Sequence, residues 1–222
     1  MRPACFSAPM IRALSRIALP ASLLVLAAAL SAQTLRNHFE SDALGREPAF
    51  FDFVVLGAPG AARWNVTGGH NPPSAPNYVA QIVDSRPRDS IAAALRRNSS
   101  FRDGTWSVAL LGAGGRGGIL FRMADEKNFL VLLIDHGTRE AVLTAYRDGR
   151  PTELAKGSTQ PANEWGVLKI TADGPKVSAS WDGKPLLEAA DSKPTGGRSG
   201  MATAGPGIGS FDEFILEPSE NR

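Results

Sequence analysis

The chain has 222 residues and a formal net charge of +2, with acidic and basic side chains interspersed along it. Scattered charge excludes the basic cluster of a nucleic-acid-binding protein, so we expect no nucleic-acid partner. The single cysteine, Cys5, excludes an internal disulfide, so burial of apolar side chains must stabilise the fold.

Residues 1–32 have the composition of a secretory signal peptide: arginines precede an uncharged apolar stretch that ends in small residues at Ala32. The alternative is a transmembrane anchor, but the stretch is shorter than the roughly 20 residues of a span and contains Pro20. Cleavage after Ala32 removes three arginines and changes the net charge from +2 to −1. We expect a periplasmic or secreted protein, with no membrane attachment after signal cleavage, whose residues 33–222 form a single domain.

The first half of the mature chain has the pattern of short strands joined by loops, with alternating branched or aromatic and polar residues. We expect strands at residues 34–39, 62–67, 78–83, 90–95 and 104–111. Residues 49–56 are strongly apolar and fit either a strand or a helical turn. Residues 68–77 contain three prolines and two glycines and predict a long surface loop. Such loops are often functional, although a plain connection is the commoner case.

Residues 117–135 predict an antiparallel hairpin, because two apolar runs flank a polar break at residues 124–127. If Met123 faces Asn128, side-chain alternation assigns each residue of the hairpin to one of two faces. The first face is wholly apolar and carries Ile119, Phe121, Met123, Leu130, Leu132 and Ile134. The second is apolar except for one arginine and carries Leu120, Arg122, Phe129, Val131 and Leu133. A hairpin that is apolar on both faces belongs in the middle of a sandwich.

Beyond this hairpin, Asp-Gly pairs at residues 148–149, 173–174 and 182–183 predict tight turns. The flanking strands are expected at residues 139–146, 151–156, 165–171, 176–181 and 184–187, and two more at 199–204 and 210–216. No amphipathic helix is predicted. Many short strands with regular turns indicate an all-β fold, an antiparallel β-sandwich or jelly roll.

Five segments together resemble a known family. They are GGILFR at 117–122, DEKNF at 125–129, WDGKPL at 181–186, GRSGMAT at 197–203 and FDEF at 211–214. Their order and spacing are similar to those of the 3-keto-disaccharide hydrolase-like domain, a bacterial extracytoplasmic member of the concanavalin A-like lectin/glucanase jelly rolls. The resemblance covers nearly the whole mature chain. It implies two antiparallel sheets, a concave face that handles sugars, and a carbohydrate or glycoside ligand.

Several motifs of catalysis or cofactor binding are absent or lack their structural context. Residues 112–117 match the dinucleotide-binding glycine pattern, but a strand is expected to follow where that motif needs a helix. The acidic cluster Glu-x-Asp-x-x-Glu of related glucanases does not occur, so ordinary retaining glycosidase chemistry is not expected. The three histidines are far apart in the sequence, which makes a structural zinc site improbable.

Asp212 is the candidate ligand for a structural calcium ion, because sandwiches of this superfamily often hold one between strands. Its alternative role is a hydrogen bond to the neighbouring strand. We expect no other cofactor.

A candidate sugar site follows from the strand that comes after the hairpin. A two-residue turn at 136–137 pairs Leu133 with Glu140 and Phe129 with Thr144. The polar face of the hairpin then extends into one surface that contains the candidates Arg122, Glu140, Thr144 and Tyr146. We expect this surface to be the concave face, since it combines an apolar shelf with polar groups.

On this surface Arg122 is the expected principal hydrogen-bond donor to a sugar, Tyr146 an aromatic contact, and Glu140 a polar partner or candidate base. The alternative is that Arg122 pairs with a nearby carboxylate and only covers the sheet. Among the aromatic residues elsewhere, Trp106 and Trp181 have the strand parity of core residues, whereas Trp64 and Tyr78 flank the proline-rich loop and remain unassigned.

Two functions are compatible with these residues. The first is a glycan-binding or accessory domain without catalytic activity. The second is a hydrolase or lyase that acts on 3-keto glycosides, as the resemblance implies. Such substrates eliminate after removal of the proton next to the ketone, so one base suffices in place of paired carboxylates. Convergent polar side chains and a base on the concave face would favour catalysis.

Overall fold

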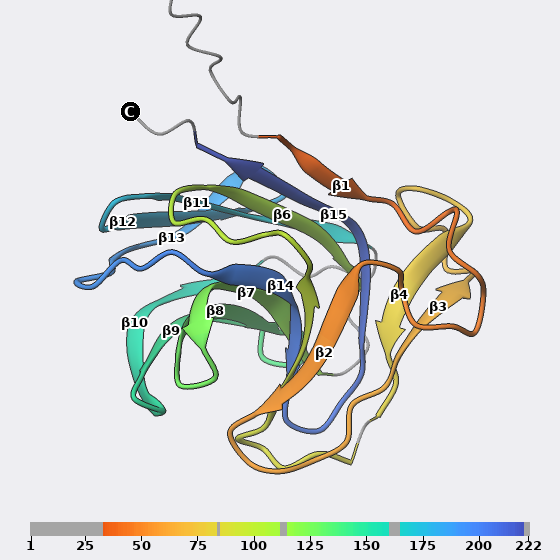
Figure 1. The fold of residues 1–222 in the computed structure, drawn as a ribbon, viewed down its shortest axis with the longest axis horizontal. Coiled ribbons are helices and arrows are strands. Elements are labelled where there is room, and N and C mark those ends of the chain that lie inside the picture. The colour runs from red at the N-terminus through yellow and green to blue at the C-terminus, as the bar shows by residue number, and fades with distance from the viewer. Residues whose placement is uncertain (1–32, 84, 112–114, 160–164, 220–222) are drawn as a thin grey trace, which may run out of the picture. The chain divides into compact units, whose positions relative to one another are not determined.

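The computed structural model describes residues 33–83, 85–111, 115–159 and 165–219 (Figure 1). The expected signal peptide, residues 1–32, and part of the glycine-rich segment 112–117 lie outside the described residues. Throughout the described ranges the regular elements are strands, and no helix there could span a membrane.

The strands form two antiparallel sheets that pack face to face. Sheet A contains, in spatial order, β13 (Lys184–Ala190), β12 (Lys176–Trp181), β11 (Gly166–Asp173), β6 (Gly104–Leu111), β15 (Gly209–Pro218), β4 (Asn77–Gln81) and β3 (Trp64–Gly68), with β1 (Leu35–Asn37) also paired to β15. Sheet B contains β10 (Arg150–Ser158), β9 (Glu140–Arg147), β8 (Asn128–Asp135), β7 (Arg116–Asp125), β14 (Arg198–Ala204), β5 (Ile91–Arg96) and β2 (Phe51–Leu56). The all-β sandwich predicted from the sequence is confirmed, and the ambiguous residues 49–56 contribute the edge strand β2.

The space between the sheets is filled by one hydrophobic core, to which both sheets contribute. Trp106 and Trp181 lie in it, as their strand parity predicts, and the unassigned Trp64 is fully buried there too. The indole Nε1 of Trp106 donates a 2.7 Å hydrogen bond to Ser199 Oγ on sheet B. A buried indole N–H needs such an acceptor, so this contact fixes the two sheets against each other.

Strand β15 joins the two ends of the mature chain. Its first half pairs with β4, its second half pairs with β1, and β6 pairs with it along the opposite edge. Leu35 lies opposite Leu216, and Asn37 opposite Phe214. The first and last strands therefore belong to the same sheet.

The hairpin β7–β8 has the predicted register in its body, where Ile119 pairs with Leu132 and Phe121 with Leu130. The predicted four-residue loop is wrong. Strand β7 continues to Asp125, which pairs with Asn128 and leaves a two-residue turn, and a register shift between Phe121 and Asp125 absorbs the difference. A β-bulge of this kind inserts an extra residue into one strand and interrupts the alternation of its side chains.

The pairing of β8 with β9 differs from the prediction by two residues. Leu133 lies opposite Val142 in place of Glu140, because the connection has four residues where two were expected. Side chains alternate with a period of two, so a shift by two residues leaves each of them on its expected face. Ala141 and Leu143 accordingly lie in the core, and Val142 and Thr144 face outward.

The Asp-Gly pairs lie in hairpin turns. Asp148-Gly149 and Asp182-Gly183 occupy the two central turn positions, all with positive φ. Asp173-Gly174 is displaced by one residue, since Asp173 pairs with Lys176. Glycine tolerates positive φ without steric cost, which explains its place in these turns.

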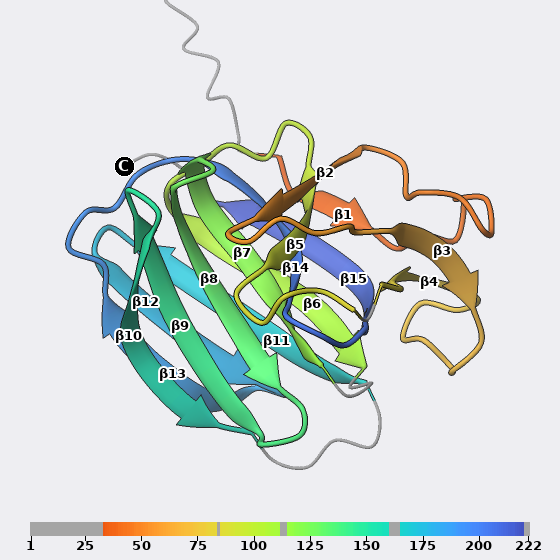
Figure 2. The same ribbon diagram turned by 90° about the horizontal axis from the view of Figure 1, so that it is seen from below.

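Sheet B is curved: its edge strands β10 and β2 lie below its central strands β7 and β14 in the view of Figure 1, and Figure 2 shows the same sheet from below. Its outer face carries a second cluster of buried apolar side chains, including Leu120, Phe129 and Val131. These side chains are at most 1% exposed although sheet A lies on the other side. The curvature explains this burial, because it brings outward side chains of neighbouring strands together.

Candidate functional site

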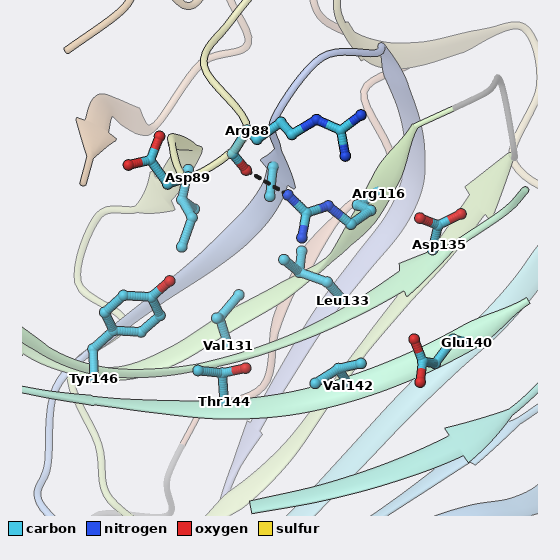
Figure 3. Close-up of a pocket in the computed structure, with 12 residues that line it drawn as sticks. Arg88, Asp89, Arg116, Val131, Leu133, Asp135, Glu140, Val142, Thr144 and Tyr146 are labelled. Atoms are coloured by element: carbon cyan, nitrogen blue, oxygen red, sulfur yellow. Dashed lines mark hydrogen bonds between the residues drawn. The ribbon is translucent and has the colours of Figure 1, made fainter. Parts of the chain in front are cut away.

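A cavity of about 240 Å³ lies on the outer face of sheet B (Figure 3). One wall is a single row of residues that pair across five adjacent strands. The row consists of Ile91, Ala204, Arg116, Asp135 and Glu140, on β5, β14, β7, β8 and β9. Directly opposed residues in a sheet hold their side chains on one face about 5 Å apart, so the backbone pairing brings three charged groups together.

The rest of this cavity, which we call the sheet B pocket, has an apolar floor and a loop above it. Val131, Leu133, Val142 and Thr144 form the floor, and Tyr146 closes one side. The segment between β4 and β5 contributes Arg88 and Asp89. A second hollow of about 550 Å³ shares Arg88, Asp89, Arg116 and Asp135 with the pocket and continues it past the end of the sheet.

The polar groups of the pocket are held in place by hydrogen bonds. Arg116 Nη2 donates a 2.6 Å bond to the Arg88 carbonyl oxygen. Asp135 Oδ1 accepts bonds of 2.9 and 3.0 Å from the backbone N–H groups of Gly137 and Thr138. Glu140 Oε1 lies 2.9 Å from the ammonium of Lys156. No ion pair joins Arg116 to a carboxylate of the described residues, which leaves its remaining N–H groups available to a ligand.

Tyr146 is oriented by Phe129, which lies opposite it on β8; the rings stack with centroids 4.4 Å apart. Burial raises the pKa of the Tyr146 hydroxyl, while the charge of Arg116 lowers it and that of Asp89 raises it. Arg116 and Asp89 line the same pocket as this hydroxyl, which stays protonated at neutral pH and can both donate and accept hydrogen bonds.

Three of the four residues predicted to bind a sugar come together here. Glu140, Thr144 and Tyr146 all line the sheet B pocket. Arg122 does not, and its expected place on this face is wrong. The bulge in β7 gives Arg122 a φ of 52°, and Met123 takes the outward position in its stead.

Arg122 lies instead at one end of the sandwich, where its side chain is fully buried. Its guanidinium is 3.1 Å from Asp191 and 2.9 Å from Asp103, and it also donates to the carbonyl oxygens of Arg102 and Gly174. A buried charge needs such compensation. The alternative interpretation, that Arg122 pairs with carboxylates, therefore describes its role.

Sequence reasoning missed Arg88, Asp89, Arg116 and Asp135. Arg116 lies in the glycine-rich segment 112–117, outside the expected hairpin, although it opens β7, and Asp135 is the last residue of that hairpin. The sequence does carry a signal for Arg116 and Asp135. The two outer ends of a hairpin lie side by side, so a charged residue at one end is expected to pair with a charged residue at the other. Arg88 and Asp89 reach the pocket from a loop, and nothing in their local pattern indicates that.

The environment of Asp212 does not fit calcium. Its two carboxylate oxygens accept hydrogen bonds from the backbone N–H of Ser74 (2.8 Å), the Ser74 hydroxyl (2.8 Å) and the Glu213 N–H (2.7 Å). Calcium needs six to eight oxygen ligands, whereas donors surround this carboxylate. Burial raises the pKa of Asp212 despite the hydrogen bonds from Ser74, which lower it. The described residues contain no group of three metal-binding side chains. Asp212 thus anchors the loop that contains Ser74.

No protein-family model matches the sequence, and no curated protein matches it either. Solved structures do match. The carbohydrate-binding module CBM66 from Bacillus subtilis superposes with a TM-score of 0.54 and 20% identity over 69% of this chain and 94% of the module. A prokaryotic β-1,3-1,4-glucanase (lichenase) from a mouse hindgut metagenome gives 0.56 and 12% over 84% of this chain and 99% of the enzyme. The Bacillus licheniformis β-glucanase gives 0.54 and 13%, over 84% and 98%.

These superpositions, at low identity, concern the fold. Together with the two-sheet topology they show that the protein folds as a jelly-roll β-sandwich of two antiparallel sheets.

Proposed function

We propose that this protein is an exported carbohydrate-binding domain that holds a sugar in the sheet B pocket. The observation that carries the proposal is the composition of the pocket. Arg116, Asp135 and Glu140 form a polar wall beside an apolar floor that ends in Tyr146. A sugar presents both hydroxyl groups and apolar C–H faces, and convergent polar groups over an apolar surface suit both.

Two further points support this proposal. The adjoining hollow of about 550 Å³ has the size of a small-molecule site, and it gives a longer glycan room to continue beyond the pocket. The fold is also shared with a carbohydrate-binding module and with glucanases.

The proposal of export rests on the signal-peptide composition of residues 1–32. An exported and processed protein begins at Gln33, which an intact-mass measurement on protein recovered from the periplasm or medium of an expressing bacterium tests. A protein retained in the membrane with residues 1–32 attached would contradict export.

The test of binding is a glycan array with the purified protein, followed by calorimetry on each glycan that binds. Val142→Trp fills the floor of the pocket and is expected to weaken binding at least about tenfold. Val167→Trp is the matched control, because Val167 is exposed on the outer face of sheet A. Equal loss of affinity in both variants, or no binding to any glycan, would refute the proposal.

Arg116→Gln removes the charge from the donor beside Arg88 and is expected to weaken binding by about tenfold to a hundredfold. Its folding should be little changed, because Arg116 forms no ion pair with a described carboxylate.

A second candidate function is cleavage of 3-keto glycosides, the activity of the family that the sequence resembles. It is favoured by the meeting of a carboxylate, a guanidinium and a phenol at Asp89, Arg116 and Tyr146. Asp89 would remove the proton from the carbon next to the ketone, and Arg116 would stabilise the resulting enolate oxygen. The enolate then expels the glycosidic oxygen, and water adds to the double bond. Glu140 suits the role of base less well, because its carboxylate is paired with Lys156.

Incubation of the protein with a 3-keto disaccharide and with the unmodified disaccharide distinguishes the two functions. An enzyme of this kind would release monosaccharide from the 3-keto disaccharide and not from the unmodified one. Asp89→Asn would lower the rate of this release by roughly 10²- to 10⁴-fold. Binding without release of monosaccharide would support the first proposal, and unchanged turnover by Asp89→Asn would refute the assigned base.

A further inference from the structure

The opposite side of the sandwich carries a second hollow, of about 720 Å³, on the outer face of sheet A. Its floor is again a row of residues paired across adjacent strands. The row consists of Asn65, Ala80, Ser210 and Leu111, on β3, β4, β15 and β6. Thr67 and Tyr78 form the next pair on β3 and β4. We call this hollow the outer groove of sheet A.

Among the described residues, no aspartate, glutamate, lysine or arginine lines this groove, although such residues make up 21% of the chain. Its polar groups are uncharged hydroxyls and an amide, from Asn65, Thr67, Tyr78 and Ser210, together with the imidazole of His70. The sheet B pocket, in contrast, contains five charged side chains. A charged ligand would lose water in the outer groove and gain no opposite charge in return.

The groove also collects exposed apolar side chains. Among the described residues, five large hydrophobic side chains are exposed, and Leu44 (63%), Ile82 (42%) and Ile208 (37%) all line the groove. Isolated exposed side chains are ordinary, but a contiguous apolar patch on a monomer commonly marks a binding surface.

One wall of the groove is aromatic and rigidly held. Tyr78 packs edge-on against Trp165 and His70, with ring centroids 5.4 and 6.0 Å apart. The Trp165 indole Nε1 donates a 2.8 Å bond to the His70 carbonyl oxygen, and Asp212 anchors Ser74 farther along the same loop. These contacts hold His70 at a φ of 57°, a left-handed conformation that costs free energy in a non-glycine residue.

We infer that the outer groove of sheet A is a second binding site, for an uncharged saccharide. Aliphatic side chains and an aromatic wall receive the apolar face of a sugar ring, and the neutral hydroxyls and amide receive its hydroxyl groups. The described lining carries no aspartate, glutamate, lysine or arginine to compensate a charged ligand, so a neutral sugar is preferred here over a uronic acid or a phosphorylated sugar. The protein would then hold glycans on two opposite faces, one charged and one neutral.

The test is NMR titration of the protein labelled in the methyl groups of isoleucine and leucine. The probes are cellobiose and maltose, which are uncharged, and glucuronate, which is charged. At least one disaccharide is expected to shift the Ile82 and Ile208 methyl signals saturably, with a Kd of roughly 1 mM or tighter, and glucuronate is expected to bind about tenfold more weakly or not at all. No shift with either disaccharide, or equal binding of glucuronate, would overturn the inference.

Variants separate this site from the sheet B pocket and from self-association. The double substitution Ile82→Ala and Ile208→Ala should weaken disaccharide binding about tenfold, because it removes apolar groups that contact the sugar from the lining of the outer groove. Val167→Ala, on the same face outside the groove lining, should leave it unchanged. The Ile82 and Ile208 shifts must persist in Val142→Trp, whatever that variant does to the sheet B pocket. Their loss in Val142→Trp, or shifts that depend on protein concentration without sugar, would overturn the inference.

Discussion

Arg122 shows how one residue connects the two sheets. It lies on β7 of sheet B, yet its partners Asp103, Gly174 and Asp191 all belong to the connections of sheet A strands. Asp191 also forms an ion pair with Arg147 on β9, with 2.7 Å between Asp191 Oδ1 and Arg147 Nη2. One buried guanidinium therefore donates to two carboxylates and two carbonyl oxygens, and each carboxylate has a second arginine partner, Arg147 at Asp191 and Arg102 at Asp103.

We predict that Arg122→Met lowers the free energy of unfolding by about 3–5 kcal/mol, because it breaks two buried ion pairs and leaves the carbonyl oxygens of Arg102 and Gly174 without this donor. Chemical denaturation measures this change. Arg150→Met, at the exposed first position of β10, is the matched control and should change stability by less than about 0.5 kcal/mol. Glycan affinity should be unchanged in folded Arg122→Met. A variant as stable as the parent would contradict the assigned role.

The same cluster predicts a dependence of stability on pH. Burial raises the pKa of Asp103, but hydrogen bonds from Arg102 and Gly174 and the charges of Arg102 and Arg122 outweigh it, so the net pKa is lowered. A lowered pKa contributes stability above the unfolded value of about 4, and this contribution is lost as the pH falls through the folded pKa. The stability difference between the parent and Asp103→Asn should therefore narrow below about pH 4. A difference that stays constant from pH 7 to pH 3 would argue against the ion pair.

At the scale of the elements, β15 holds sheet A together. Phe211, Phe214 and Leu216 are fully buried on it, and the Asn37 side-chain amide of β1 donates a 3.1 Å bond to the Phe214 carbonyl oxygen. The short β1 pairs only with β15 among the described strands, so its protection should depend on that strand.

We predict that Phe214→Ala destabilises the fold by about 3–5 kcal/mol, through lost burial and the cavity that remains. In hydrogen exchange, the amides of β1 and of the second half of β15 should become unprotected together. Phe50→Ala is the control, since Phe50 is 62% exposed and should tolerate the change. Independent exchange of the two strands would contradict their pairing.

The hairpins show which features the sequence predicts and which it does not. Apolar alternation predicted the faces of β7, β8 and β9, and these survived an error of two residues in the β8–β9 register because alternation repeats every two residues. The bulge at Arg122 could not be predicted, since its positive φ is stabilised by partners distant in the chain. Side-chain alternation also predicts half of the residues that line the sheet B pocket. Glu140, Thr144 and Tyr146 follow from alternation, whereas Arg88 and Asp89 reach the pocket through the path of a loop.

At the scale of the whole molecule, the sandwich presents two outer faces with opposite chemistry. The sheet B pocket contains five charged side chains, whereas the outer groove of sheet A is lined, among the described residues, by aliphatic and neutral polar groups and by His70. Both sites are built from rows of paired strands whose inner faces pack into one core. Ligand binding on either face therefore requires little rearrangement of the backbone, and substitutions in one site should not alter the other.

The last prediction concerns ordinary β-glucans, which the protein is expected not to hydrolyse despite its structural likeness to glucanases. A retaining glucanase needs one carboxylic acid that gives a proton and one carboxylate about 5–5.5 Å away that attacks the sugar. In the sheet B pocket the Glu140 carboxylate is paired with the Lys156 ammonium, and Asp135 Oδ1 accepts two backbone N–H bonds. Both carboxylates are therefore already engaged by donors of the protein itself, and the sequence lacks the clustered acids of those enzymes on any one strand. Incubation with laminarin and lichenan, followed by a reducing-sugar assay, should give no more product than buffer. Sustained release that is lost in Glu140→Gln would show that Glu140 takes part in hydrolysis and that the pocket is a glycosidase site.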